Sequence, residues 1–204
     1  MKIFLTSQIK ELDSYTIANE PIDSIDLMER AAQRLYDLLV SQFPEGDLFY
    51  FFIGPGNNGG DGLAVARLLS GLGKKLEVFL LSNPDKLSPN AKLNYQRLSK
   101  ASGPHIRLLE KGMALPVIPS EAIVVDAIFG SGLTRPVDGF IKQVIGHINS
   151  AARTVVAIDT PSGLPGEDCG CVPSDSIVRA SYTYTLEFPK ISFFFPENLP
   201  FVGA

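Results

Sequence analysis

Short, continuous apolar runs separated by helical patterns constrain this sequence more than any other feature does. The runs lie at Leu48–Ile53, 76–81, 122–125 and 155–158. A continuous run is typical of a strand that is buried on both faces, as in a parallel sheet. Because segments with helical spacing connect the runs, the sequence predicts right-handed βαβ units. The expected fold class is therefore α/β, a three-layer α/β/α sandwich with a mainly parallel central sheet.

Two helical patterns precede the first run, so two N-terminal helices are expected. Ser7 is a suitable N-cap for the first helix, and Asp23 or Ser24 for the second. The remaining elements follow the same two periodicities: helices over 63–72, 89–101 and 140–148, and short strands over 106–109 and 181–188.

Length and charge narrow the class of protein. Residues 1–204 fit a single domain, and 18 Lys and Arg against 22 Asp and Glu give a net charge of −4, so we expect no nucleic-acid partner. No apolar run approaches the ~20 residues of a membrane helix, and the amino terminus turns polar too early for a secretory signal. We therefore expect no membrane partner and a cytoplasmic location. Cys169 and Cys171 have no second cluster near them, so a metal or redox role is not favoured.

A glycine-rich segment, GPGNNGGDG, follows the first apolar run at residues 54–62. It satisfies the pattern G-x-G-x-x-G between a strand and a helix, which is typical of dinucleotide binding. Pro55 removes a backbone donor, however, and Asp61 places a carboxylate where a pyrophosphate would otherwise lie. A tight turn would explain the glycines but not the two asparagines and the aspartate, so we predict a ligand-binding loop.

Polar residues also follow the third and fourth runs. Asp126 ends one strand, and Gly130 and Gly132 then leave backbone N–H groups free for an anion. Arg135 adds a positive charge that suits a phosphate or, alternatively, a surface ion pair.

Asp159 occupies the same strand-end position as Asp126. Because ligands of open α/β sheets bind beyond the carboxyl ends of the strands, we expect the two aspartates to share one site. Neighbouring carboxylates share a proton, bind a cation or divide into acid and base. Asn58, Asp126 and Ser162 together offer one charge and two neutral oxygens, which suits a monovalent ion better than Mg²⁺.

At these segments the sequence resembles the YjeF amino-terminal family, the NAD(P)H-hydrate epimerases. The resemblance covers nearly the whole chain, at residues 8–13, 27–32, 54–62, 126–136, 159–163 and 184–190. It implies a Rossmann-like fold and the interconversion of the R and S forms of hydrated NADH and NADPH (NADHX and NADPHX).

The resemblance also implies roles for individual residues. Asp159 would be the catalytic acid/base and would contact the nucleotide, and Asn58, Asp126 and Ser162 would hold a potassium ion. Further nucleotide contacts are implied at Asn57, Asn58, Gly59, Gly60, Asp61, Gly130, Ser131, Gly132, Leu133, Thr134, Arg135 and Pro136. In the expected route Asp159 protonates the departing C6 hydroxyl and water adds to the opposite face, with burial raising the pKa of Asp159. Ring opening and closure is the alternative route.

Two expectations concern neighbouring chains and domains. Family homodimers suggest that Leu35, Leu38 and Leu39 pack across a two-fold interface, the alternative being that they cover the sheet. Family members usually continue past the segment 184–190 through another glycine-rich turn and strand, so we expect truncation at the carboxyl-terminal edge. In many bacteria the domain is fused to an ADP- or ATP-dependent NAD(P)HX dehydratase.

Two other functions are alternatives to the epimerase. A non-catalytic nucleotide- or RNA-associated binding module of the same fold would have a degraded site, whereas Asp126, Asp159 and the segment 54–62 are intact. An ordinary NAD-dependent oxidoreductase would need a hydride-transfer site, and no such residue pair is identifiable.

Overall fold

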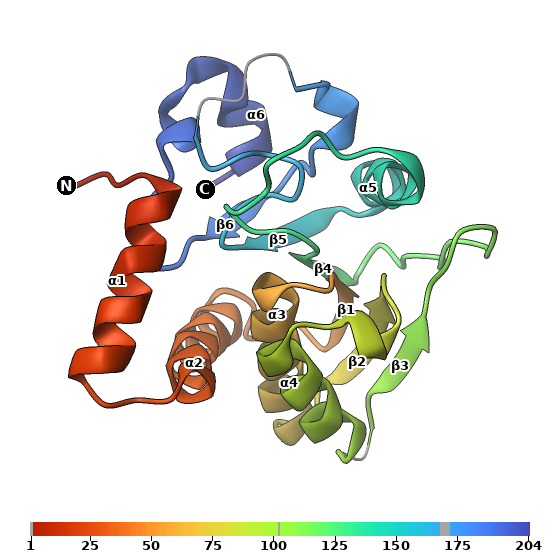
Figure 1. Cartoon of the computed structure of the whole chain (residues 1–204). Helices are drawn as coiled ribbons and strands as arrows, with labels where there is room; N and C mark the ends of the chain where they lie inside the picture. Colours follow the sequence, from red (N-terminus) through yellow and green to blue (C-terminus); the bar gives the residue numbers. More distant parts are fainter. Residues whose placement is uncertain (1, 102, 168–171) are drawn as a thin grey trace.

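The computed structural model describes residues 2–101, 103–167 and 172–204. Six strands form one parallel sheet in the order β3-β2-β1-β4-β5-β6 (Figure 1). The strands are β1 (Leu48–Ile53), β2 (Lys75–Leu80), β3 (His105–Leu108), β4 (Ile123–Ala127), β5 (Thr154–Ile158) and β6 (Tyr182–Tyr184). The helices are α1 (Thr6–Asn19), α2 (Ser24–Gln42), α3 (Asn57–Gly71), α4 (Pro89–Ser99), α5 (Gly139–Ala151) and α6 (Leu199–Val202). Cys169 and Cys171 lie outside the described residues.

Helices cover both faces of the sheet. Figure 1 shows α3 and α4 on one side, with α2 beside them, and α5 on the other. On the first side Phe51 and Ile53 pack among buried residues of α2, α3 and α4. On the second side Phe52 packs in a cluster that includes Val144 and Ile148 of α5. The predicted three-layer α/β/α sandwich is confirmed.

The carboxyl ends of the central strands meet at one edge of the sheet. Ile53 of β1 pairs with Ala127 of β4, and Ile158 of β5 pairs with Tyr184 of β6. The strand order reverses at β1, and ligands bind at such a switch point in open α/β sheets. The segments that follow β1, β4, β5 and β6 are therefore brought together by the register of the sheet.

The glycine-rich segment is helical, which corrects the predicted loop and the predicted start of the helix at residue 63. α3 already begins at Asn57, so most of the segment forms its first turns. Close packing requires glycine at two of these positions: a Cβ at Gly59 would lie 2.0 Å from the carbonyl oxygen of Gly54, and one at Gly62 would lie 2.5 Å from Cβ of Ala127. Closely spaced glycines disfavour a helix, and tertiary contact overrides that preference.

The leading helices differ from expectation in two details. Leu35 and Leu39 of α2 are buried in the core above the sheet, so their predicted role in a two-fold interface is wrong and the alternative holds for them. Leu38 is half exposed. Ser7 does not cap α1: the helix begins at Thr6, where Oε1 of Gln8 accepts the backbone N–H of Leu5 at 2.9 Å.

The predicted last strand is shorter than the sequence indicated. β6 ends at Tyr184, and residues 185–190 turn back toward the carboxyl ends of the other strands, with Glu187 in the left-handed region at φ 60°. Along the outer edge of β6, the backbone N–H of Thr183 donates to the carbonyl oxygen of Ala204 at 3.1 Å. None of the helices in the described part of the chain is long and apolar enough to cross a membrane.

Candidate active site

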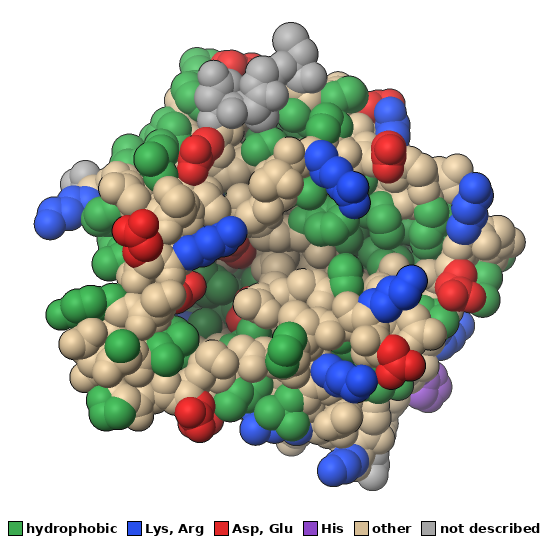
Figure 2. Space-filling view, in the orientation of Figure 1, with side chains coloured by type: hydrophobic (Ala, Val, Ile, Leu, Met, Phe, Trp, Pro, Cys, Tyr) green, Lys and Arg blue, Asp and Glu red, His purple; other side chains and the backbone are tan. Residues whose placement is uncertain are grey.

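A cavity of about 1050 Å³ lies at the carboxyl end of the sheet, where α1 and α2 face the segments after β4, β5 and β6. Figure 2 shows the hollow with acidic and basic side chains around its mouth. Many of the predicted site residues line it: Asn57, Asn58, Asp61, Gly130, Ser131, Gly132, Leu133, Thr134, Arg135 and Asp159. Five do not: Gly59, Gly60, Asp126, Pro136 and Ser162.

Asp159 lies in the cavity wall just after β5, held in the left-handed region at φ 64°. Its Oδ2 accepts the backbone N–H of Ser131 at 3.0 Å, and its Oδ1 accepts that of Leu186 at 3.4 Å. A Cβ at Gly130 would lie 2.8 Å from Oδ2, so only glycine permits this approach. These contacts fix the direction of the carboxyl group in the cavity wall.

Lys190 is the counter-charge of Asp159, and the sequence did not single it out as a site residue. Its side chain is only 2% exposed, and Nζ lies 2.8 Å from Oδ1 of Asp159. The same ammonium donates to the carbonyl oxygens of Leu186 at 2.9 Å and Phe188 at 3.0 Å. All three of its donors are therefore satisfied, which is the condition under which a charged group is buried. The only sequence signal was its place at the end of the closing segment 184–190.

Asp126 lies beneath the cavity floor within β4, fully buried. Its Oδ1 accepts the hydroxyl of Ser162 at 2.6 Å, and its Oδ2 accepts the backbone N–H of Ser162 at 2.8 Å. Burial raises the pKa of Asp126 to about 6, against the opposing effect of these hydrogen bonds. Asp126 thus binds the segment after β5 to the end of β4.

Asn58 supplies two buried polar atoms that have no partner among the described residues, Oδ1 and Nδ2. Its Cβ and Cγ lie 3.4 and 3.5 Å from the position that a Cβ of Gly130 would take, so the side chain lies against the segment after β4. Ser162 contacts the same segment, because its hydroxyl accepts the backbone N–H of Phe129 at 2.8 Å. An unpartnered amide oxygen, a buried carboxylate and a hydroxyl around one segment fit a monovalent cation.

Asp61, rather than Asp126, interacts electrostatically with Asp159, as Glu187 also does. It lies in the second turn of α3, is 7% exposed and lines the cavity. Burial raises the pKa of Asp61 well above its usual value, and the charges of Asp159 and Asp13 raise it further. The expectation that Asp126 and Asp159 form the interacting pair therefore needs correction, because the hydrogen bonds of Asp126 run to Ser162 and Ile128.

The first helix contributes charged groups that the sequence did not reveal. Lys10 and Asp13 of α1 line the cavity together with Glu187. Burial raises the pKa of Glu187 to about 7, and a hydrogen bond and charge repulsion from Asp13 add to the effect. No local pattern marks these residues, because their place in the site depends on where α1 packs.

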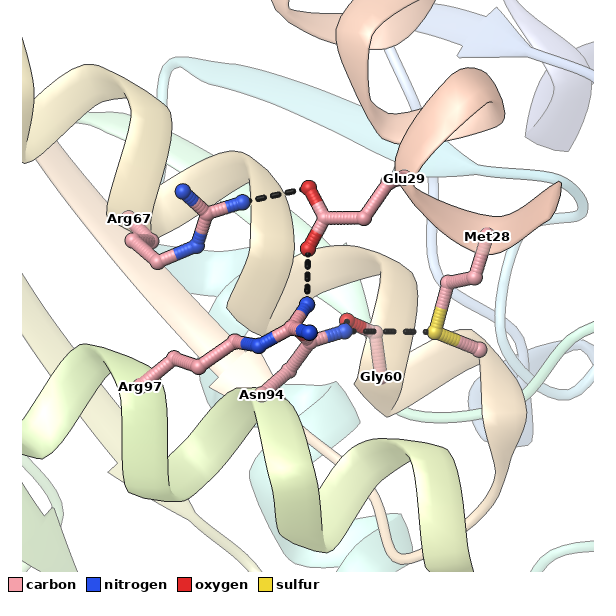
Figure 3. A network of polar contacts seen from close by, with 6 residues as sticks. All are labelled: Met28, Glu29, Gly60, Arg67, Asn94 and Arg97. Carbon is pink, nitrogen blue, oxygen red and sulfur yellow. Dashed lines mark hydrogen bonds and ion pairs between the residues drawn. The ribbon is translucent and has the colours of Figure 1, made fainter. Parts of the chain in front are cut away.

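A polar network joins α3 to α2 and α4 (Figure 3). Glu29 of α2 pairs with Arg67 of α3 and with Arg97 of α4, the latter at 2.7 Å. Nδ2 of Asn94 lies 3.3 Å from the carbonyl oxygen of Gly60. The network joins three helices next to the turns that carry Asn58 and Asp61.

The comparisons with known proteins identify the family of the chain. A family model described as "YjeF-related protein N-terminus" matches residues 24–192. The NAD(P)H-hydrate epimerase of Limosilactobacillus fermentum is 32% identical over 202 residues, which cover 97% of this chain and 91% of that protein. The NAD(P)H-hydrate epimerase of Rhodobacter capsulatus is 37% identical over 169 residues, which cover 79% of this chain and 77% of that protein.

Longer relatives and a solved structure extend the comparison. The bifunctional NAD(P)H-hydrate repair enzyme Nnr of Thermofilum pendens is 38% identical over 216 residues, and this chain spans 38% of its length. The crystal structure of yeast ynu0, YNL200c, matches this structure with a TM-score of 0.79 at 23% sequence identity. The match covers 97% of this chain and 86% of the yeast chain, so the two chains share a fold. The resemblance seen in the sequence is confirmed: this chain belongs to the YjeF-related N-terminal family.

Proposed function

We propose that this chain is an isomerase that interconverts the R and S forms of hydrated NADH and NADPH. The observation that carries the proposal is the placement of Asp159, paired with a buried lysine, in the wall of the large cavity at the carboxyl end of the sheet. Relatives that align along most of the chain are named for this epimerisation, which supports the function expected from the sequence.

The cavity suits a dinucleotide. Its volume of about 1050 Å³ lies at the top of the ~300–1,000 Å³ range of small-molecule pockets. The first N–H groups of α3 have no acceptor within the helix, and Lys10 and Arg135 add positive charge to the wall. Because Asp61 places a carboxyl group near the start of α3, we assign the diphosphate-bearing part of the substrate to Lys10 and Arg135 and the hydrated nicotinamide ring to the neighbourhood of Asp159.

A potassium ion is proposed as the cofactor, held by Asn58, Asp126 and Ser162. The unpartnered amide of Asn58 and the buried carboxylate of Asp126 support this set. Bound there, the ion would supply a fixed positive charge behind the segment after β4. In the protein itself, Asp126 and Ser162 hold that segment in place, and the backbone N–H of Ser131 orients Asp159.

The proposal extends to the location, the oligomeric state and the partners of the chain. We propose a cytoplasmic homodimer that acts with an NAD(P)HX dehydratase, either fused to it or separate. Relatives named as bifunctional repair enzymes support the link to a second activity.

The deciding experiment follows the conversion of the S-hydrate into the R-hydrate by chromatography, with and without the protein. Acceleration over the spontaneous rate supports the epimerase. Binding without acceleration would indicate the non-catalytic module, and a change in the amount of reduced cofactor would indicate an oxidoreductase. Labelling with oxygen-18 water during turnover distinguishes the two routes, because loss and re-addition of the hydroxyl incorporates solvent oxygen.

A further inference from the structure

Among the described residues, four carboxyl groups line the cavity: Asp13, Asp61, Asp159 and Glu187. Asp61 differs from the other three in its surroundings. It is more than nine-tenths buried on α3, and burial and two neighbouring carboxylates account for its raised pKa, with no hydrogen bond from another described residue contributing. An unpartnered carboxyl that faces a cavity from a rigid helix is available to a ligand.

Asp61 and Asp159 are placed in opposite electrostatic environments. Asp159 is surrounded by the ammonium of Lys190 and the backbone N–H groups of Ser131 and Leu186, all of which are directed at its carboxyl oxygens. Asp61 has no such donor among the described residues, and its environment favours the protonated form. A carboxyl without donors beside one that is held by an ammonium and two N–H groups suits a division into acid and base.

Asp159 is also too firmly held to serve both faces of a substrate ring. Its two carboxylate oxygens are engaged by groups from the segments after β4 and β6, and its backbone is locked in the left-handed region. Inversion at one carbon requires a hydroxyl to leave from one face and water to add to the other. Asp61 enters the same cavity from a different element, α3, whereas Asp159 follows β5.

We propose that Asp61 is a second catalytic residue, the acid that protonates the departing hydroxyl, while Asp159 is the base that activates the incoming water. This assignment rests on the proposed epimerase function. The proposal gives to two carboxyl groups the acid and base roles that the family resemblance implies for Asp159 alone.

The proposed step balances in atoms and charge. The proton of Asp61 moves to the C6 hydroxyl, the C6–O bond breaks with its electron pair on the leaving water, and the lone pair of the ring nitrogen forms an iminium. Water then adds to C6 on the opposite face and gives its proton to Asp159, while the iminium electrons return to nitrogen. The net change is one proton moved from Asp61 to Asp159, which returns through water in the cavity.

The test compares wild-type protein with Asp61→Asn, which keeps the shape but cannot donate a carboxylic proton. We expect kcat to fall ~10²–10⁴-fold, as for the loss of a general acid, while the affinity for NADPH, an unreactive analogue, stays unchanged. A variant that keeps more than a tenth of kcat overturns the proposal. So does weakened NADPH binding with unchanged kcat, because Asp61 would then only bind the nucleotide.

The dependence of the epimerisation rate on pH is an independent measurement, and it uses active protein. In the wild type the rate should decline as pH rises through the pKa of Asp61, because the acid form is lost. Asp13→Asn removes a charge that raises the pKa of Asp61. The other charged groups that line the cavity among the described residues are Lys10, Arg30, Arg34, Arg135, Asp159, Glu187 and Lys190. We therefore expect Asp13→Asn to move this decline to lower pH. If the rate of Asp13→Asn declines at the same pH as that of the wild type, the proposal is overturned, even if Asp61→Asn does not fold. If the wild type has no epimerase activity, the proposed function itself is refuted.

Discussion

The ammonium of Lys190 lies 2.8 Å from Oδ1 of Asp159, so the segment after β6 supplies the counter-charge for a carboxylate at the end of β5. The two residues are brought together by the parallel pairing of Ile158 with Tyr184. A carboxylate so placed is fixed in direction as well as in charge. The pair is therefore both a structural tie and part of the proposed reaction machinery.

Replacing Lys190 by Met should cost ~3–5 kcal/mol of unfolding free energy, because it leaves the partner of a buried ion pair uncompensated. Two carbonyl oxygens also lose their donor. Denaturant unfolding measures the effect. Lys92→Met is the matched control: it breaks the exposed pair with Asp85, which should be worth only ~0–1 kcal/mol. Equal losses in the two variants would contradict the assigned role of Lys190.

Replacing Asp159 by Asn should lower the epimerisation rate ~10²–10⁴-fold, the usual cost of losing general acid/base help. Asn tolerates the left-handed backbone that this position requires, whereas Ala would add strain. Because Lys190 loses its counter-charge, the variant should also be less stable, so the rate is measured where unfolding controls show it folded. Turnover above about a tenth of wild type would make Asp159 an organiser of the loop.

Asn58→Ala should raise the potassium concentration needed for full activity while leaving stability nearly unchanged. The amide has no partner to lose among the described residues, and Ala is favourable in a helix. Asp126→Ala is a less specific test, because it would also leave the N–H and hydroxyl groups of Ser162 without their acceptors. Titration with potassium, against a large organic cation, checks the prediction. Activity that is indifferent to the choice of cation would rule out the proposed site.

Glu187→Gln should make stability less dependent on pH between about 4.5 and 7. In the folded chain the pKa of Glu187 is raised from 4.5 to about 7, so the native state holds a proton that the unfolded chain releases. Its contribution to stability is therefore fully present below pH 4.5 and is lost as pH rises toward 7. Thermal unfolding across this range measures the slope. Glu110→Gln, at an exposed position, should leave the slope as it is in the wild type.

Gly62→Ala should destabilise the fold by ~1–3 kcal/mol through overpacking, because the new methyl group would meet Ala127 at 2.5 Å. Gly71→Ala in the same helix is the control, since nothing lies within 4 Å of that position. There the substitution should stabilise by up to ~0.5–1 kcal/mol. Unfolding midpoints of the two variants that shift in the same direction would contradict the packing explanation for the glycines of α3.

The sequence by itself determined the layered parallel sheet, the family and the place of the strand-end residues. Continuous apolar runs and helical spacing are local patterns, and a parallel register then brings the segments after β1, β4 and β5 to one edge. For that reason the sequence is enough to single out Asn58, Asp126 and Asp159 as site candidates. The potassium ion and the homodimer stay predictions.

Only the tertiary structure decided which groups face one another across the cavity. The direction of a side chain after a strand depends on its hydrogen-bond partners: Asp126 is bound to Ser162, and Asp61 lines the cavity together with Asp159. Lys190 and Asp13 enter the site from segments that are far from it in the sequence. The glycine-rich segment is a helix because packing against β1 and β4 outweighs local propensity. Partner choice and packing are properties of the folded chain, and no local pattern encodes them.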